Sequence, residues 1–164
     1  MPYYMGAMIL RKAAMERLIL SLKKDYPSLT FVEGNFLCWS PGEKQIYYEA
    51  TSDDRGTYGV LHEIGHARLE HSSYSSDMDL LHKEVLAWQE ALLIATQYGI
   101  ELDESHIQDC LDTYRDWLYK RSTCPNCKAK GVQRRMYMYI CINCHNRWRV
   151  SNSRFCRPYR RSTQ

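Results

Sequence analysis

The sequence predicts an α+β fold, in which helices and a small antiparallel sheet are followed by a short cysteine-rich module. Helical periodicity returns several times in the first 120 residues, and three short β-rich segments lie between the first two helical ones. The charge changes where the cysteines begin. Residues 1–119 have a balance of −9 and residues 120–164 a balance of +12, which together give the net charge of +3. We therefore expect three parts, at residues 1–120, 121–152 and 153–164.

The first predicted helix covers residues 8–24, where apolar residues recur at helical spacing. Charged side chains interrupt the stretch Met1–Leu22, and no apolar run in the chain approaches the ~20 residues that span a bilayer. We therefore expect neither a signal peptide nor a membrane partner, and we expect a cytoplasmic protein.

Three strands and three more helices are predicted to follow. The strands are expected at Leu29–Val32, Asn35–Trp39 and Gln45–Glu49. Gly34 and the Pro41-Gly42 turn signal separate them, which favours an antiparallel meander. The edge of its last strand is a candidate site for pairing with an extended substrate. The further helices are expected from the Thr51–Asp54 start signal to about His71, from about Ser75 to Tyr98 and from about Asp103 to beyond Leu118.

The strongest signal is the H-E-x-x-H motif at residues 62–66, inside the second predicted helix. His62 and His66 lie about one turn apart and point the same way, so both imidazoles can bind one metal ion. Glu63 is turned by about 100° from His62. It can therefore act as the general base on a zinc-activated water instead of as a ligand. The alternative is that two surface histidines fall four apart by chance.

A catalytic zinc usually has three protein ligands and a water. The candidates for the third ligand are His71, His82, Glu84 and Glu90. We favour Glu84, because a helical wheel places it in the middle of an apolar face, where an unpaired carboxylate is costly. The alternatives are that Glu84 forms a salt bridge with a core arginine, or that it is partly exposed and has no functional role. His71 and His82 remain fallback ligands. Candidate donors to the oxyanion are Tyr47, Tyr48, Tyr58, His71 and His82.

Together, V-L-H-E-I-G-H-A at residues 60–67 and E-V-L-A-W at residues 84–88 resemble the minimal gluzincins of the ImmA/IrrE type. The resemblance covers roughly residues 8–100. It implies a zincin-like helical domain and a small intracellular zinc peptidase with two His ligands and one Glu ligand. The third ligand would come from the helix after the motif, where Glu84 matches it best. Cleavage of a repressor or antitoxin protein is also implied.

Two cysteine knuckles predict a C-terminal zinc ribbon. Its ligands are expected to be Cys124, Cys127, Cys141 and Cys144. Four thiolates suit a closed, structural zinc, whose binding energy would fold a piece with little core of its own. The hairpin strands are expected at residues 136–140 and 147–150. Redox-active dithiols are the weaker alternative, because no thioredoxin-like strand and helix surround them.

Basic and aromatic residues alternate in this ribbon, which favours DNA or RNA as a partner. The candidate contacts are Arg134, Arg135, Arg147, Trp148 and Arg149. The alternatives are docking of the basic tail on the acidic first domain, or an acidic protein partner.

Three functions therefore stay open. The first is a zinc metalloendopeptidase that cleaves a protein regulator or a nucleic-acid-associated protein, with one catalytic and one structural zinc. The second is a SprT/Spartan-like protease, which also joins H-E-x-x-H to a zinc ribbon and acts on proteins on DNA. That family's third ligand comes from a His-Gly segment, which is absent here. The third is a non-catalytic, nucleic-acid-binding regulator.

Overall fold

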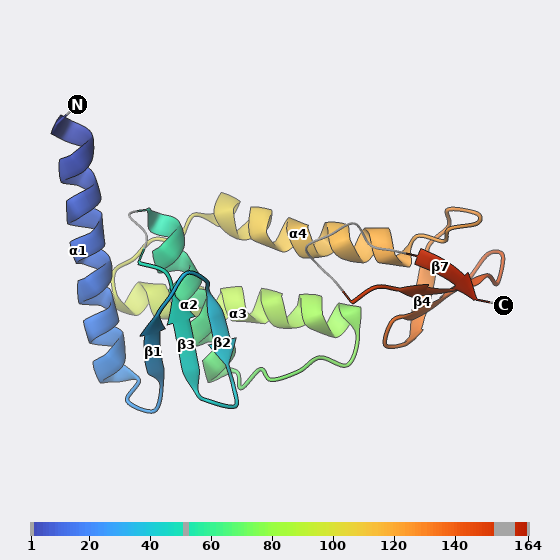
Figure 1. The fold of residues 1–164 in the computed structure, drawn as a ribbon, viewed down its shortest axis with the longest axis horizontal. Coiled ribbons are helices and arrows are strands. Elements are labelled where there is room, and N and C mark those ends of the chain that lie inside the picture. The colour runs from blue at the N-terminus through green and yellow to red at the C-terminus, as the bar shows by residue number, and fades with distance from the viewer. Residues whose placement is uncertain (1, 51–52, 153–159, 164) are drawn as a thin grey trace. The chain divides into compact units, whose positions relative to one another are not determined.

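The computed structural model describes residues 2–50, 53–152 and 160–163, with side chains from residue 13 onward. Within them the fold is α+β, as the sequence predicts (Figure 1). The helices are α1 (Pro2–Asp25), α2 (Asp54–Arg68), α3 (Asp77–Gln97) and α4 (Glu104–Ser122). The strands are β1 (Thr30–Glu33), β2 (Cys38–Ser40), β3 (Gln45–Tyr48), β4 (Gly131–Arg135), β5 (Met138–Cys141), β6 (Arg147–Val150) and β7 (Arg160–Thr163).

The chain forms two compact units. The first comprises Met1–Ser72 and Lys83–Asp103, and the second comprises Ser73–His82 and Glu104–Gln164. Helix α4 therefore groups with the cysteine-rich residues. The domain boundary that we expect after residue 120 stays a prediction.

The first unit contains a three-stranded sheet with the order β1-β3-β2. The Pro41-Gly42 signal does form the turn of an antiparallel β2–β3 hairpin, but β1 pairs with β3 in parallel on the other side. The antiparallel meander that we expected is therefore wrong. The expected substrate edge on the third strand is also wrong, because β3 is the central strand and both of its edges are occupied.

Helix α2 packs against β2 and β3, while α1 packs against α2 and β1. Apolar side chains at helical spacing give α2 its inner face, and Val60, Leu61 and Ile64 are fully buried there. Each such side chain contributes about 1.5–3 kcal/mol on burial. The packed face fixes the rotation of α2, and with it the direction in which His62 and His66 point.

Helix α2 ends at Arg68, before the expected His71. Glu70 has a φ of 52°, and the backbone N–H of His71 donates to the carbonyl of His66 at 3.0 Å. A left-handed residue of this kind closes a helix and turns the chain. The turn brings His71 back towards the last turn of α2.

The second unit contains an antiparallel sheet with the order β4-β5-β6-β7. The expected β5–β6 hairpin is present, in the register Tyr139↔Trp148. Strands β4 and β7 were not predicted from the sequence, and β7 lies in the segment that we expected as a basic tail. Residues 153–159 of that tail lie outside the described residues. Tyr139 and Trp148 stack at 5.6 Å between ring centroids and form the core of the unit with Val150.

Over the described parts of the chain, every helix is too short or too polar to cross a lipid bilayer.

Candidate metal centres

The first centre joins α2 to α3 within the first unit. The Nε2 atoms of His62 and His66 lie 3.1 Å apart. The carboxylate of Glu84 reaches both rings, with Oε2 at 3.2 Å from His62 Nε2 and Oε1 at 3.6 Å from His66 Nε2. The structure thus brings together the three residues that the sequence analysis proposes as ligands, and Glu84 faces two imidazoles instead of a core arginine.

The separations of these atoms suit a tetrahedral zinc. Zinc bonds of ~2.0–2.1 Å at tetrahedral angles place ligand atoms about 3.3 Å apart. The three observed separations lie on either side of that value. His62, His66 and Glu84 therefore form a group that could hold a metal ion. Their role as ligands stays a prediction.

Glu84 is buried, with 6% of its surface exposed. Burial alone would raise the pKa of this carboxyl, but hydrogen bonds from His62 and His66 and the charges on their rings hold the pKa of Glu84 well below its ordinary value. Glu84 is therefore ionised at neutral pH, which is the form that binds a metal.

A glycine allows α2 and α3 to come this close. A Cβ atom on Gly65 would lie 2.4 Å from the backbone carbonyl oxygen of Ala87. Ala87, Ala91 and Ala95 are buried along the facing side of α3. The small residues on both helices bring Glu84 within reach of the motif.

Glu63 is held by the edge strand. Its Oε2 accepts the backbone N–H of Trp39 in β2 at 2.7 Å. In the antiparallel β2–β3 pair, alternate backbone groups of β2 point away from β3, and this N–H is one of them. The indole N–H of Trp39 also donates to the carbonyl of His71 at 2.8 Å. Strand β2 therefore positions the candidate base, a role that the sequence analysis did not find.

The two histidines of the motif are oriented in different ways. His66 Nδ1 lies 2.9 Å from His71 Nδ1, on the opposite side of the ring from Nε2. The ring of His62 packs on Trp88 at 4.3 Å between centroids, and its Nδ1 is buried with no hydrogen-bond partner among the described residues. His71 thus contacts the candidate ligand His66 on the side away from Nε2, which differs from the fallback role of His71 as a ligand itself.

The remaining candidates for this site are engaged elsewhere or exposed. Glu90 pairs with Arg68 at 2.7 Å. The hydroxyl of Tyr47 donates to Glu43 and Gln45, and that of Tyr58 to the carbonyl of Glu101. Tyr48 is buried, and His82 is exposed. None of these contacts favours one residue as the oxyanion donor.

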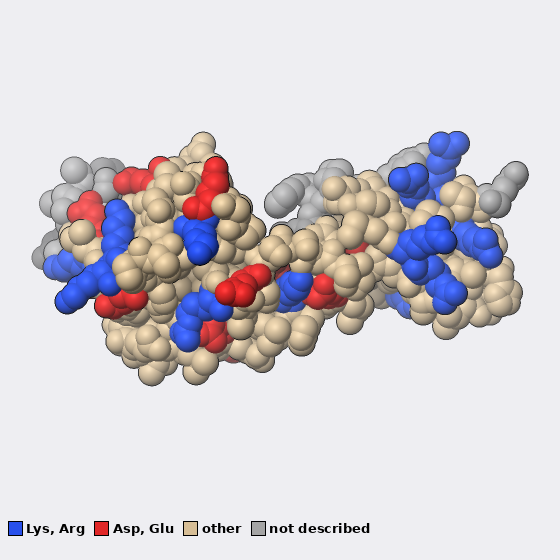
Figure 2. All heavy atoms as spheres, turned by 90° about the horizontal axis from the view of Figure 1, so that it is seen from below, with Lys and Arg blue, Asp and Glu red and all other residues tan. Residues whose placement is uncertain are grey.

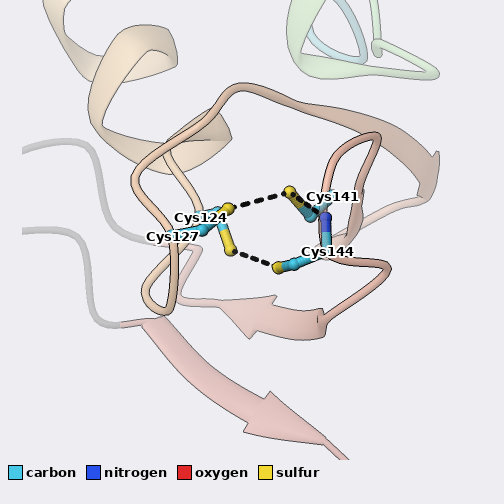
Figure 3. A group of neighbouring side chains, drawn as sticks. All are labelled: Cys124, Cys127, Cys141 and Cys144. Atoms are coloured by element: carbon cyan, nitrogen blue, oxygen red, sulfur yellow. Dashed lines mark hydrogen bonds between the residues drawn. The ribbon is translucent and has the colours of Figure 1, made fainter.

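The second centre is the cluster of four cysteines, whose sulfurs face one another (Figure 3). The Sγ atoms of Cys124 and Cys144 lie 3.7 Å apart, and those of Cys127 and Cys141 lie 3.4 Å apart. Zinc–sulfur bonds of ~2.3 Å at tetrahedral angles place the sulfurs about 3.8 Å apart. The cluster could therefore hold a metal ion such as zinc, as expected of a ribbon.

The surroundings of these thiols favour the thiolate at some positions. The backbone N–H of Ala129 and the side chain of Asn143 lower the pKa of Cys127 to about 6. The backbone N–H of Asn146 lowers the pKa of Cys144, but contact with Cys127 and burial outweigh it and raise the pKa to about 11. A divalent cation would let all four sulfurs ionise together.

The expected nucleic-acid contacts separate into two groups. Arg134, Arg135, Arg147 and Arg149 are exposed, but Trp148 is fully buried. The role of Trp148 in base contact is therefore wrong. Its side chain points to the opposite face of β6 from the two arginines beside it, because side chains alternate along a strand.

No protein-family model, curated protein or solved structure matches the chain. The resemblances to ImmA/IrrE-type and SprT/Spartan-like peptidases therefore stay predictions that rest on the motifs.

Proposed function

We propose that this chain is a zinc-dependent metalloendopeptidase that cleaves a protein substrate. The observation that carries the proposal is the convergence of two motif histidines with a buried carboxylate from the next helix, beside a glutamate anchored on an edge strand. Two His ligands and one Glu ligand are a common set in catalytic zinc sites that keep a fourth position for water. We also propose a cytoplasmic location, since paired cysteines stay reduced and available to metal there.

The roles follow from the chemistry of each side chain. His62, His66 and Glu84 would hold the metal. A bound zinc ion would lower the pKa of a water molecule and polarise the scissile carbonyl. Glu63 would accept the proton of the attacking water and deliver it to the leaving amine. The backbone N–H of Trp39 fixes one oxygen of Glu63, which keeps the other oxygen available for this transfer.

The substitution Glu63→Gln tests the base. It keeps the size of the side chain and one acceptor for the Trp39 N–H, but it removes the basic group. We expect the variant to retain zinc and to lose cleavage by about 10²–10⁴-fold. Glu43→Gln is the matched control, because Glu43 lies in the β2–β3 turn and is exposed.

The substrate can be sought with the same variant. Proteins captured by the zinc-loaded Glu63→Gln chain would be identified and then incubated with the wild-type chain. Cleavage by the wild type and none by the variant would support the peptidase. If the wild-type chain binds zinc at His62, His66 and Glu84 but cleaves none of the captured proteins, the peptidase proposal is wrong. Cleavage only in the presence of DNA would favour the SprT/Spartan-like alternative.

A further inference from the structure

The outer face of the second sheet carries a row of arginines. Residues directly opposite each other on paired strands share a face of the sheet. Arg149 of β6 lies opposite Arg161 of β7 on one side and Met138 of β5 on the other, and Met138 lies opposite Arg135 of β4. Arg147 shares this face because it lies two residues from Arg149. We name Arg135, Arg147, Arg149 and Arg161 the arginine face.

This arrangement places like charges side by side. Arg149 and Arg161 are directly opposed, and like charges in such pairs destabilise a sheet. Residues 120–164 contain no acidic side chain that could offset them. In Figure 2 the Lys and Arg side chains gather over the residues of the second sheet, whereas acidic side chains lie among the basic ones elsewhere. A polyanionic partner would relieve this repulsion.

The same sheet offers little for stacking on bases. Its large aromatic residues, Tyr139 and Trp148, point to the inner face and are buried in the core. Proteins that bind single strands combine basic grooves with exposed aromatic platforms. Among the described residues of the sheet, the arginine face has the first property without the second, so its chemistry suits phosphates and not unstacked bases. Planar guanidinium groups bind phosphate oxygens in a bidentate manner, and all four cations of the face are arginines.

We propose that the arginine face binds the phosphate backbone of duplex DNA without reading its sequence. The four arginines of the face come from three strands of one sheet, β4, β6 and β7, and β7, which we expected as a tail, supplies one of them. The proposal does not depend on the peptidase proposal, since it concerns only the second unit.

Affinity for a short labelled duplex, measured by fluorescence anisotropy over a range of salt concentrations, tests this proposal. The double variant Arg149→Gln/Arg161→Gln removes the opposed pair. We expect its dissociation constant to rise by at least about tenfold at physiological salt. The slope of log affinity against log salt should become shallower by about 0.9 for each phosphate that the variant no longer neutralises.

The matched control is Lys23→Gln/Lys24→Gln, which makes the same change of charge on the exposed last turn of α1. It should bind the duplex like the wild type, and zinc content and circular dichroism should be unchanged in both variants. Equal weakening by the control, or unchanged affinity of the arginine variant, would overturn the proposal. So would tighter binding of a single strand than of the duplex, or binding of an acidic peptide at the face in place of DNA.

Discussion

The ring of His66 has neighbours on both of its nitrogens. Nε2 faces His62 and Glu84, and Nδ1 lies 2.9 Å from Nδ1 of His71. Only one hydrogen atom can lie between the two Nδ1 atoms, so one ring donates and the other accepts. An imidazole that binds metal through Nε2 keeps its proton on Nδ1. His66 would therefore donate to His71, and this bond would fix the tautomer that binding requires.

His71→Ala should weaken zinc binding at the His62/His66/Glu84 centre by about 10–100-fold, because contacts behind a ligand orient it and set its basicity. His71→Asn should restore most of the affinity, since its side-chain oxygen can occupy the place of Nδ1. Competition with a chelator measures both values. His82→Asn, on an exposed histidine, is the control. Equal zinc affinity of His71→Ala and the wild type would show that His71 does not orient His66.

The contact between His66 and His71 could not be predicted from the sequence. If α2 continued to residue 71, His71 would point away from His66. The helix ends at Arg68 because Glu70 adopts a φ of 52°, and no glycine or asparagine signals that end. In contrast, the spacing of His62 and His66 and the apolar surroundings of Glu84 are helical properties. Those three positions could therefore be predicted from the sequence.

At the scale of elements, the close approach of α2 and α3 depends on the glycine at position 65. The carbonyl oxygen of Ala87 occupies the place where a side chain of residue 65 would begin. A Cβ atom at residue 65 would lie 2.4 Å from the carbonyl oxygen of Ala87. A rotamer change cannot relieve this contact, because neither atom moves with a side-chain torsion, so one helix must move. Because Glu84 lies one turn before Ala87 on α3, any such movement changes its distance from both imidazoles.

Gly65→Ala should therefore lower zinc affinity at the His62/His66/Glu84 centre and destabilise the fold. Overpacking a tight interface typically costs about 1–3 kcal/mol. Chelator competition and urea unfolding measure the two effects. Gly42→Ala is the control, because a Cβ there has no neighbour within 4 Å. If Gly65→Ala binds zinc like the wild type, the helices can separate without moving Glu84 away from the histidines.

The order of the strands in the first sheet could be predicted from the sequence only in part. Turn residues identify the β2–β3 hairpin, which is a local structure. The parallel pairing of β1 with β3 joins segments across that hairpin, and no local signal encodes it. The burial of Trp148, in contrast, could have been predicted from the sequence. Its neighbours Arg147 and Arg149 alternate with it along a strand, which places the indole on the face opposite two cations.

On the scale of the whole molecule, a buried ion pair joins distant parts of the chain in the second unit. Asp77 at the start of α3 accepts two hydrogen bonds from Arg121 at the end of α4, from Nε at 2.6 Å and from Nη2 at 3.1 Å. The hydroxyl of Tyr139 in β5 donates to the same carboxylate at 2.6 Å. Burial and the bond to Asp77 raise the pKa of Tyr139, so its phenol stays protonated as a donor.

Asp77→Asn should destabilise the second unit by about 3–5 kcal/mol, because it leaves the fully buried guanidinium of Arg121 without a counter-charge. Urea unfolding of the zinc-loaded chain, followed by tryptophan fluorescence, measures the change. Asp116→Asn is the control, since its pair with Lys120 is exposed and such pairs contribute at most ~1 kcal/mol. A destabilisation as small as that of the control would mean that Arg121 finds another partner.

The two metal centres differ in how much protein surrounds them. Cys124 and Cys141 are buried, and four thiolates would enclose the ion of the ribbon. Among the described residues, the group of His62, His66 and Glu84 would supply three ligands, so a metal there would keep one position open to a competitor. A chelator should therefore remove one of two zinc ions per chain quickly and the other slowly.

Two variants test which centre holds which ion. Cys141→Ser should lose the slowly removed ion and keep the other, whereas Glu84→Gln should lose the quickly removed ion and keep the slow one. Elemental analysis before and after chelation counts the ions. A wild-type chain that holds a single zinc ion, or loses both at one rate, would contradict the assignment of an open and a closed centre.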